Sequence, residues 1–295
     1  MNKPKIYKYE IYGLVIASAF PIQELNPCNE ERAVDINIVF ADLGLINPDA
    51  KVEVSFSEDR QVIILPAVGA FILDGMDTVL VERKPGVSDD FLAVPLLGPV
   101  IAISLHLRRK FILHGSAVVY NGKAYGFVGD KGAGKSTLAA MLLKNPGVDF
   151  LTDDLLVVES DNGLIRGYPQ LKLSDEALAN SDQSLGRVRP PPIDIFPKNQ
   201  FLLNDHLPYD TVPIGGIFEL RRDLDARVED LSSADALRVL LRFSYMGRFQ
   251  DRQVSSIERA DTFSTTTALS STGRVKRIFV PDRITDLDKV IDLLD

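Results

Sequence analysis

The chain has 295 residues, of which 45% are hydrophobic and 25% charged, so it is long enough for one large or two smaller globular domains. Its formal net charge of −8 argues against a protein that coats a nucleic-acid backbone, because neutralising phosphates requires clustered lysines and arginines. The single cysteine, Cys28, has no second cysteine with which to form an internal disulfide.

The first ninety residues predict a series of strands. Tyr7–Ser18 and Val34–Phe40 are rich in β-branched and aromatic residues, and Val52–Phe56 alternates apolar with polar residues. Further short strands, separated by turn residues, are predicted at Gln61–Leu65, Ala70–Leu73 and Thr78–Glu82. Strands spaced this closely indicate an antiparallel meander. We therefore expect residues 1–90 to form a small β-rich N-terminal domain.

Two apolar stretches of the chain are compared with a signal peptide and with a membrane-spanning helix. Ile11–Phe20 follows several lysines, as in a signal peptide, but it contains Gly13 and directly follows Glu10, which favours a strand. Phe91–Leu105 is shorter than the ~20 residues of a membrane span and is interrupted by two prolines, which favours a buried helix over Leu92–Leu107. We therefore expect a cytoplasmic protein that does not insert into a membrane.

After residue 90 the pattern alternates between strands and helices, which is typical of an α/β domain. The predicted elements are strands at Lys110–Leu113, Ser116–Tyr120 and Ala124–Val128, a hairpin turn at Asn121-Gly122, a helix at Gly134–Lys144, a strand at Asp149–Leu151 and a terminal helix at Thr285–Leu294. We expect residues 91–295 to form an α/β catalytic domain with a mixed sheet.

The segment Gly129–Ser136 reads GDKGAGKS and matches the P-loop (Walker A) pattern G-x-x-x-x-G-K-[ST] at every fixed position. Its glycines allow the backbone N–H groups to converge on phosphate oxygens, and the following helix adds its positive N-terminal end. Lys135 supplies a charge for the β- and γ-phosphates, and the Ser136 hydroxyl can hold Mg²⁺. The predicted nucleotide-binding residues are Gly129, Asp130, Lys131, Gly132, Ala133, Gly134, Lys135, Ser136 and Thr137.

Two adjacent acids, Asp153 and Asp154, follow the predicted strand Asp149–Leu151. A strand–helix–strand path would return the chain beside the P-loop and place both carboxylates at the end of that strand. Phosphoryl transfer uses one carboxylate to orient Mg²⁺ and often another to accept the proton of the attacking hydroxyl. His114 lies one hairpin before the P-loop, so antiparallel pairing would bring it near the phosphates, although a purely structural role is an equal alternative.

These residues resemble the C-terminal catalytic domain of the HPr serine kinase/phosphorylase family. The similar features, which lie in the same order and at closely similar spacing, are His114-Gly115, the hairpin, Gly129–Ser136 and Thr152-Asp153-Asp154. The segments Tyr12–Leu14 and Phe20–Leu25 resemble the leading part of divergent members found in peptide-modification clusters, some of which phosphorylate a serine of a lasso-peptide precursor.

The resemblance implies the fold shared with phosphoenolpyruvate carboxykinases, with ATP and Mg²⁺ as ligands. It implies that Lys135 binds the ATP phosphates and that Ser136 ligates Mg²⁺. It also implies that Asp154 takes the proton from the substrate hydroxyl and that His114 lies against the transferred phosphate. The chain departs from the family at Thr137, where a glutamate is usual, and it lacks the glutamate expected before its Ile-Arg-Gly run. Asp153 is therefore the candidate for the further metal ligand.

The segment from Arg187 to Lys198 is basic and contains three successive prolines, which favour an extended backbone. Its cations Arg187, Arg189 and Lys198 are candidates for contacting phosphate or an acidic peptide. The alternative is a solvated connection between two elements. We expect a mobile loop beside the active site.

The sequence thus predicts an ATP-dependent serine kinase whose acceptor is a peptide or small protein, with a lasso-peptide precursor among the candidates. The alternatives are a nucleotide-binding switch or ATPase module, and transfer of phosphate or a nucleotidyl group to a small molecule or peptide. A switch commonly carries a base-recognition motif, and Asn-Lys-x-Asp is not found in the chain. A homo-oligomer is an open alternative to a monomer, because members of the resembling family can be oligomeric.

Overall fold

The computed structural model describes residues 5–28, 31–57, 60–159, 163–191, 198–204, 210–249 and 256–294, with the side chains of 256–261 left out. The chain divides into two compact units: residues 1–109 with 248–260, and residues 110–247 with 261–295. The boundary expected at residue 90 differs from this division, because the helical segment after residue 88 groups with the N-terminal strands.

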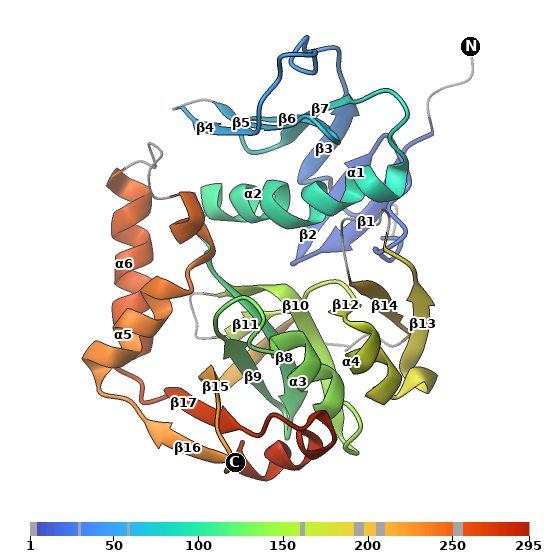
Figure 1. The fold of residues 1–295 in the computed structure, drawn as a ribbon. Coiled ribbons are helices and arrows are strands. Elements are labelled where there is room, and N and C mark those ends of the chain that lie inside the picture. Colours follow the sequence, from blue (N-terminus) through green and yellow to red (C-terminus); the bar gives the residue numbers. More distant parts are fainter. Residues whose placement is uncertain are drawn as a thin grey trace. The chain divides into compact units, whose positions relative to one another are not determined.

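The first unit contains a mixed sheet whose described strands run in the order β1-β2-β3-β7-β6-β5-β4 (Figure 1). Their bounds are β1 (Tyr7–Ile11), β2 (Leu14–Ser18), β3 (Ile36–Phe40), β4 (Glu53–Phe56), β5 (Arg60–Leu65), β6 (Gly69–Asp74) and β7 (Thr78–Arg83). The predicted strand Tyr7–Ser18 is a hairpin, because Tyr12 and Gly13 both adopt positive φ and reverse the chain. The strands β4 to β7 form the predicted antiparallel meander, whereas β3 pairs in parallel with β2 and β7.

A kinked helical segment follows these strands. It consists of α1 (Asp89–Pro95), a π-helical turn (Leu96–Val100) and α2 (Ile101–Leu107). The kink lies at Gly98, whose φ of −97° and ψ of −105° are not helical, next to Pro99, which has no N–H to donate. Asp89–Leu107 is long and apolar enough to cross a membrane. However, 72% of its most apolar stretch of 18 residues is buried in the structure, as is typical of a core helix.

The second unit is built around a mixed sheet whose described strands run in the order β11-β10-β8-β9-β15-β17-β16. Their bounds are β8 (Phe111–Tyr120), β9 (Lys123–Val128), β10 (Val148–Val158), β11 (Gly163–Ile165), β15 (Thr211–Arg222), β16 (Arg227–Asp230) and β17 (Val275–Val280). β15 pairs in parallel with both β9 and β17, and the other pairings are antiparallel. Asn121 and Gly122 have φ of 48° and 72° and form the predicted tight turn between β8 and β9. The α/β class with a mixed sheet is confirmed.

A smaller sheet in the second unit has the strand order β12-β14-β13 among the described residues. Its strands are β12 (Gln170–Leu173), β13 (Gly186–Arg189) and β14 (Asn199–Leu203). The remaining α-helices are α3 (Lys135–Leu142), α4 (Asp175–Asn180), α5 (Ser233–Arg242) and α6 (Ser256–Ser270). Short 3₁₀ turns lie at Gln183–Leu185, Tyr245–Phe249, Ile284–Asp286 and Asp288–Leu293. The prediction of an α-helix at Thr285–Leu294 is therefore wrong, since two 3₁₀ turns cover most of this segment.

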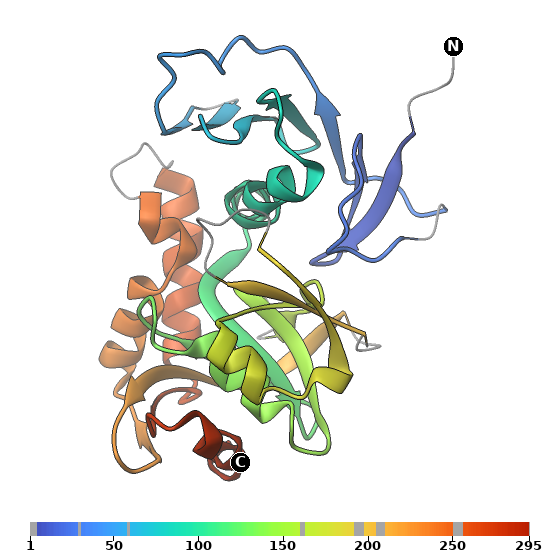
Figure 2. The same cartoon turned by 45° about the vertical axis from the view of Figure 1, so that its right-hand side comes forward.

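Hydrophobic side chains pack on both faces of the large sheet, because successive residues of a strand point to opposite faces. Val118 and Phe127 belong to a core that includes α3, the small sheet and the C-terminal turns. Ala117 and Val119 belong to a second core that includes α5 and the end of α6. The helices α5 and α6 lie side by side in both ribbon views (Figures 1 and 2). The strands β8, β9 and β10 are therefore covered on both faces, and the segments at their ends extend from a packed core.

Candidate functional site

The Gly129–Ser136 segment joins β9 to α3, so the strand and helix predicted on either side of it are present. Gly132 and Gly134 have φ of 86° and 94°, a region that glycine enters without steric cost. The Lys135 Nζ donates to the carbonyl oxygen of Gly129 at 2.9 Å and to that of Asp130 at 3.1 Å. The loop is thus folded around the amine of Lys135.

The Asp153 carboxylate is buried, with 5% of the residue exposed, and contacts the start of α3. Ser136 Oγ donates to Asp153 Oδ1 at 2.9 Å, and Ser116 Oγ donates to the same oxygen. The backbone N–H of Lys172 donates to Asp153 Oδ2 at 3.1 Å. Burial raises the pKa of Asp153, and the neighbouring charge of Asp154 raises it further. The two predicted metal ligands, Ser136 and Asp153, therefore lie side by side.

The acid pair lies inside β10, so the prediction that it follows the end of a strand is wrong. Asp153 is opposite Ser116 of β8 and Asp154 is opposite Gly115, and β10 continues to Val158. Two polar residues in succession resemble a turn in the sequence. Here the backbone of both is paired with β8, and the apolar residues that follow continue the strand.

Asp154 interrupts the regular strand with a φ of 69°, a left-handed conformation that is uncommon outside glycine. Thr152 Oγ1 donates to the carbonyl oxygen of Leu155 at 2.9 Å and spans the two acids. Consecutive side chains of a regular strand point to opposite faces, so this distortion explains how both carboxylates reach one residue, Lys172. Such backbone strain costs about 1–3 kcal/mol and clusters at functional sites.

Lys172 is the main site residue that the sequence analysis did not find. It lies on β12, and its ammonium donates to Asp154 Oδ2. Burial opposes ionisation of Asp154, but the charge and hydrogen bond of Lys172, with His114 and Lys198, lower the pKa of Asp154 to about 2. Burial likewise disfavours the charged form of Lys172. The negative charge and the hydrogen bond of Asp154 have the larger effect, so the pKa of Lys172 is raised. The only sequence signal was a lysine between two leucines in an alternating strand.

His114 lies beside both the acid pair and the loop. The register of β8 and β9 places Gly115 opposite Val128, so His114 reaches the level at which the loop begins. Its Nδ1 is 3.1 Å from the carbonyl oxygen of Asp154, which can only accept, so Nδ1 carries a hydrogen. The ring also lies 6.5 Å, centroid to centroid, from the Tyr245 ring in an edge-on arrangement.

Two arginines contact the loop from elements distant in sequence. The Nη2 of Arg242, at the end of α5, donates to both carboxylate oxygens of Asp130 at 2.9 Å. Arg222, at the end of β15, lies so close to Gly134 that a Cβ there would be 2.2 Å from the arginine Nη2. Burial lowers the pKa of Arg222, although an arginine so shifted is still charged at neutral pH. Arg222 was not predicted, because only the parallel pairing of β15 with β9 brings it to the loop.

The predicted basic loop is in part a strand. Arg187 and Arg189 lie on β13, which pairs with β14, and Lys198 directly precedes β14. The expectation of a loop is therefore wrong for residues 186–189. Residues 192–197, which include Pro192, lie outside the described residues. The charge of Lys198 contributes to lowering the pKa of Asp154.

The donor set at the loop suits Mg²⁺ better than a metal held by protein side chains alone. Within the described ranges, no three His, Cys, Asp or Glu side chains gather into a metal cluster. Mg²⁺ commonly binds through one or two protein oxygens and completes its octahedron with water and substrate phosphates. The Ser136 hydroxyl and the Asp153 carboxylate match that requirement.

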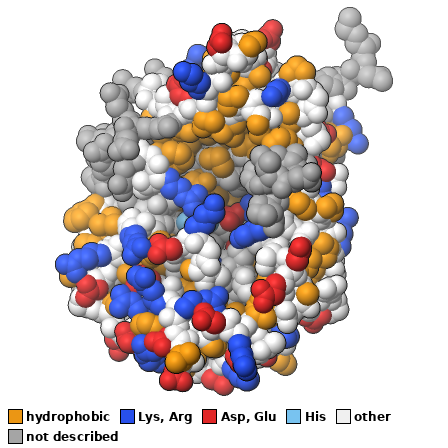
Figure 3. Space-filling view, in the orientation of Figure 1, with side chains coloured by type: hydrophobic (Ala, Val, Ile, Leu, Met, Phe, Trp, Pro, Cys, Tyr) orange, Lys and Arg blue, Asp and Glu red, His pale blue; other side chains and the backbone are white. Residues whose placement is uncertain are grey.

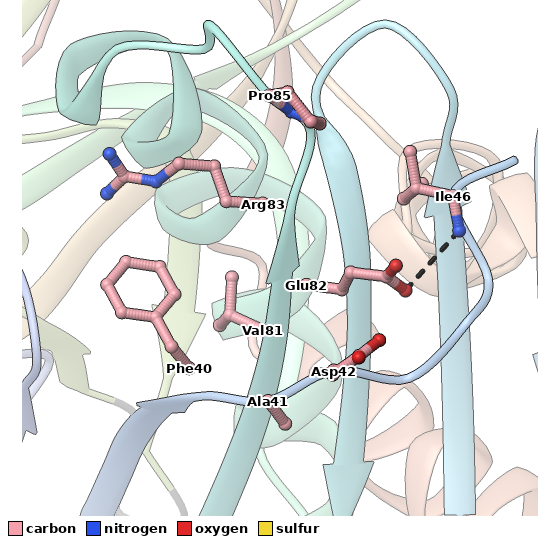
Figure 4. Close-up of a pocket in the computed structure, with 8 residues that line it drawn as sticks. All are labelled: Phe40, Ala41, Asp42, Ile46, Val81, Glu82, Arg83 and Pro85. Carbon is pink, nitrogen blue, oxygen red and sulfur yellow. Dashed lines mark hydrogen bonds between the residues drawn. The ribbon is translucent and has the colours of Figure 1, made fainter.

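A separate cavity lies in the first unit and contains none of the predicted site residues. Its volume is about 620 Å³, and it is lined by Phe40, Ala41, Asp42, Ile46, Val81, Glu82, Arg83 and Pro85 (Figure 4). Glu82 accepts from the backbone N–H groups of Leu45 and Ile46 at 2.8 and 3.3 Å, and the Arg83 guanidinium lies 4.7 Å from the centre of the Phe40 ring.

No protein-family model matches the chain, and a search of curated proteins finds no match. The assignment of a function to the site therefore depends on its residues and their geometry.

Proposed function

We propose that the chain is an ATP-dependent kinase that transfers the γ-phosphate to a serine hydroxyl of a peptide or small protein. The observation that carries the proposal is the 2.9 Å hydrogen bond between Ser136 and Asp153, formed at the start of a helix whose first residue is Lys135. It joins a phosphate-binding sequence motif to an acid pair that lies seventeen residues further along the chain. Asp154, the second acid, pairs with Lys172, and this cation holds the pKa of Asp154 low.

Each residue has a role that follows from its position. Lys135 and the backbone of Gly129–Ser136 bind the phosphates of ATP. Ser136 and Asp153 would hold Mg²⁺, which would supply positive charge to the phosphates. Arg222, beside Gly134, adds a positive charge at the same end of the helix.

The transfer forms a bond between the serine oxygen and the γ-phosphorus and breaks the bond from that phosphorus to the oxygen bridging to the β-phosphate. ADP leaves, and the serine proton passes to Asp154. A pKa of about 2 keeps Asp154 ionised, so it can orient the hydroxyl before the proton moves. A weak base suffices, because charge at the attacking oxygen develops late in phosphoryl transfer. His114, whose Nδ1 donates a hydrogen bond to the carbonyl oxygen of Asp154, contributes to the shape of this part of the site.

The decisive experiment incubates the full chain with Mg²⁺, ATP labelled at either the α- or the γ-phosphate, and a library of serine-containing peptides. Transfer of γ-label to serine, lost in Lys135→Ala, is the expected result. Transfer of α-label would replace the proposal with nucleotidyl transfer. Release of labelled phosphate without any labelled peptide would favour an ATPase or switch, or a small-molecule acceptor.

A further inference from the structure

The small sheet β12-β14-β13 has one apolar face and one basic face. Leu171 and Phe201 point to the side that packs in the core with α3. The register pairs Lys172 with Gln200 and Gln200 with Arg189, which places these three side chains together on the other face. By the same alternation, the side chains of this face are those of Gln170, Lys172, Arg187, Arg189, Lys198, Gln200 and Leu202.

The charged side chains that the small sheet itself contributes to this face are all cations, and one of them, Lys172, is paired with Asp154 of β10. Four of these side chains are cations, those of Lys172, Arg187, Arg189 and Lys198, and none of those named is an acid. This distribution is unusual in a chain with a net charge of −8. Lys and Arg lie among Asp and Glu on the surface drawn in Figure 3. A local concentration of cations attracts anionic groups, and the attraction is strongest where water is partly excluded.

Asp153 connects the phosphate-binding loop with the small sheet, because its Oδ1 accepts from Ser136 of the loop and its Oδ2 accepts from the backbone N–H of Lys172. The Lys172 ammonium then contacts Asp154. The side chains of Lys172 and Asp154 are each 27% exposed, and Arg187 and Lys198 are exposed. Gln170, Gln200 and Leu202 of this face are buried, so its accessible part consists of Arg187, Arg189, Lys198 and the partly exposed Lys172–Asp154 pair, where a molecule can reach Asp154 from solvent.

We propose that the basic face of the small sheet binds the acceptor, and that the acceptor is a peptide segment with acidic side chains next to its serine. The inference rests on the proposed kinase function and adds the substrate class. Arginine and lysine favour carboxylates, and two arginines two residues apart on β13 suit an extended acidic segment.

The first test measures binding without requiring transfer. A fluorescent peptide with a central alanine flanked on both sides by glutamates is titrated into the full chain with Mg²⁺ and ADP, beside an otherwise identical peptide with lysines. We expect the glutamate peptide to bind at least about tenfold more tightly, and the preference to shrink as salt is added. Equal affinity for the two peptides would overturn the inference.

The second test compares variants. Arg187→Gln combined with Arg189→Gln should weaken binding of the glutamate peptide about tenfold and leave ATP affinity unchanged. Arg238→Gln, an exposed arginine of α5 whose side chain is 75% exposed, is the matched control and should change neither affinity. Unchanged peptide binding in the double variant would contradict the inference, and weaker ATP binding would reassign these arginines to the nucleotide.

The same peptides with serine in place of alanine separate failure of the inference from failure of the proposed function. Preferential γ-label transfer to the glutamate peptide supports both. Equal labelling of the glutamate and lysine peptides would support the kinase function and overturn the inference that the acceptor is acidic. Tight binding of the glutamate peptide without any labelling would support binding of an acidic peptide and overturn the proposed kinase function.

Discussion

At the scale of single residues, the site depends on one lysine that satisfies two acids. Lys172 donates its backbone N–H to Asp153 and its ammonium to Asp154. Without this cation, two adjacent carboxylates in a partly buried site would repel each other and lose hydration. The strained φ of Asp154 is what allows one lysine to serve both.

Replacing the lysine should therefore destabilise the protein before any ligand is added. Lys172→Met is expected to lower the free energy of unfolding by about 2 kcal/mol, because it leaves the partly buried carboxylate of Asp154 without its partner. Chemical denaturation of the ligand-free protein measures this. In a double-mutant cycle, Lys172→Met in an Asp154→Asn background should cost much less; equal costs in both backgrounds would show that the pair is not coupled.

The contribution of the Lys172–Asp154 pair to the free energy of unfolding should depend on pH, and the direction follows from the pKa of Asp154. The pKa of Asp154 is lowered from its ordinary 3.8 to about 2, so its contribution to stability is present above pH ~4 and is lost as the pH falls toward 2. The difference in unfolding free energy between the wild type and Lys172→Met should accordingly narrow across that range. A difference that stayed constant from pH 6 to about 3 would argue against an ionised Asp154 held by Lys172.

Asp154 should be required for transfer and dispensable for nucleotide binding. Asp154→Asn keeps the size of the side chain but removes the proton acceptor, so the rate of γ-label transfer should fall by about 10²- to 10⁴-fold. Calorimetric titration with Mg²⁺ and ATP should give an affinity close to that of the wild type. Retention of full transfer activity would remove Asp154 from the mechanism.

At the scale of elements, the strands of the large sheet determine which residues meet at the loop. Gly115 of β8 shows how closely they pack: a Cβ there would lie 2.4 Å from the carbonyl oxygen of Phe127 and 2.5 Å from Leu156 Cδ1. The glycine next to His114 is thus explained by the close approach of β8, β9 and β10. On the other side of β9, Glu219 of β15 is opposite Val128, the last residue before the loop.

Glu219 is a buried acid whose removal should weaken this sheet. It is 2% exposed, accepts from Arg221 at 2.6 Å and accepts from Arg277 of β17 at 2.9 Å. Glu219→Ala is expected to lower the free energy of unfolding by about 3 kcal/mol, since it removes the buried partner of Arg221 and leaves Arg277 only the more distant Glu229, at 3.8 Å. Glu229→Ala is the control, because that side chain is 44% exposed and should cost no more than about 1 kcal/mol. Similar losses in the two variants would contradict the assignment of Glu219 as the structural partner.

At the scale of the whole molecule, the predicted site residues described here all belong to the second compact unit. They come from β8, the loop before α3, β10 and the small sheet, which are far apart along the chain. A ligand that contacts several of these elements stabilises the folded state by mass action, because the unfolded chain cannot assemble them.

Mg²⁺ and ATP together should therefore raise the melting temperature. At a hundred times the dissociation constant the stabilisation is about 2.7 kcal/mol, which corresponds to roughly 5 °C for a chain of this size. Differential scanning fluorimetry measures the shift. Lys135→Ala and addition of EDTA should each abolish most of it, and an equal shift in Lys135→Ala would mean that ATP binds elsewhere.

The sequence alone determined the features that depend on neighbouring residues. The β-rich N-terminal region, the Asn121-Gly122 turn and the strand–loop–helix around Gly129–Ser136 were predicted because turn chemistry, alternation and glycine spacing act over a few residues. Only the tertiary structure showed that Asp153 and Asp154 lie inside β10 and that Lys172 pairs with them. Strand register and the packing of one sheet on another decide such contacts, and both depend on residues far apart in the chain.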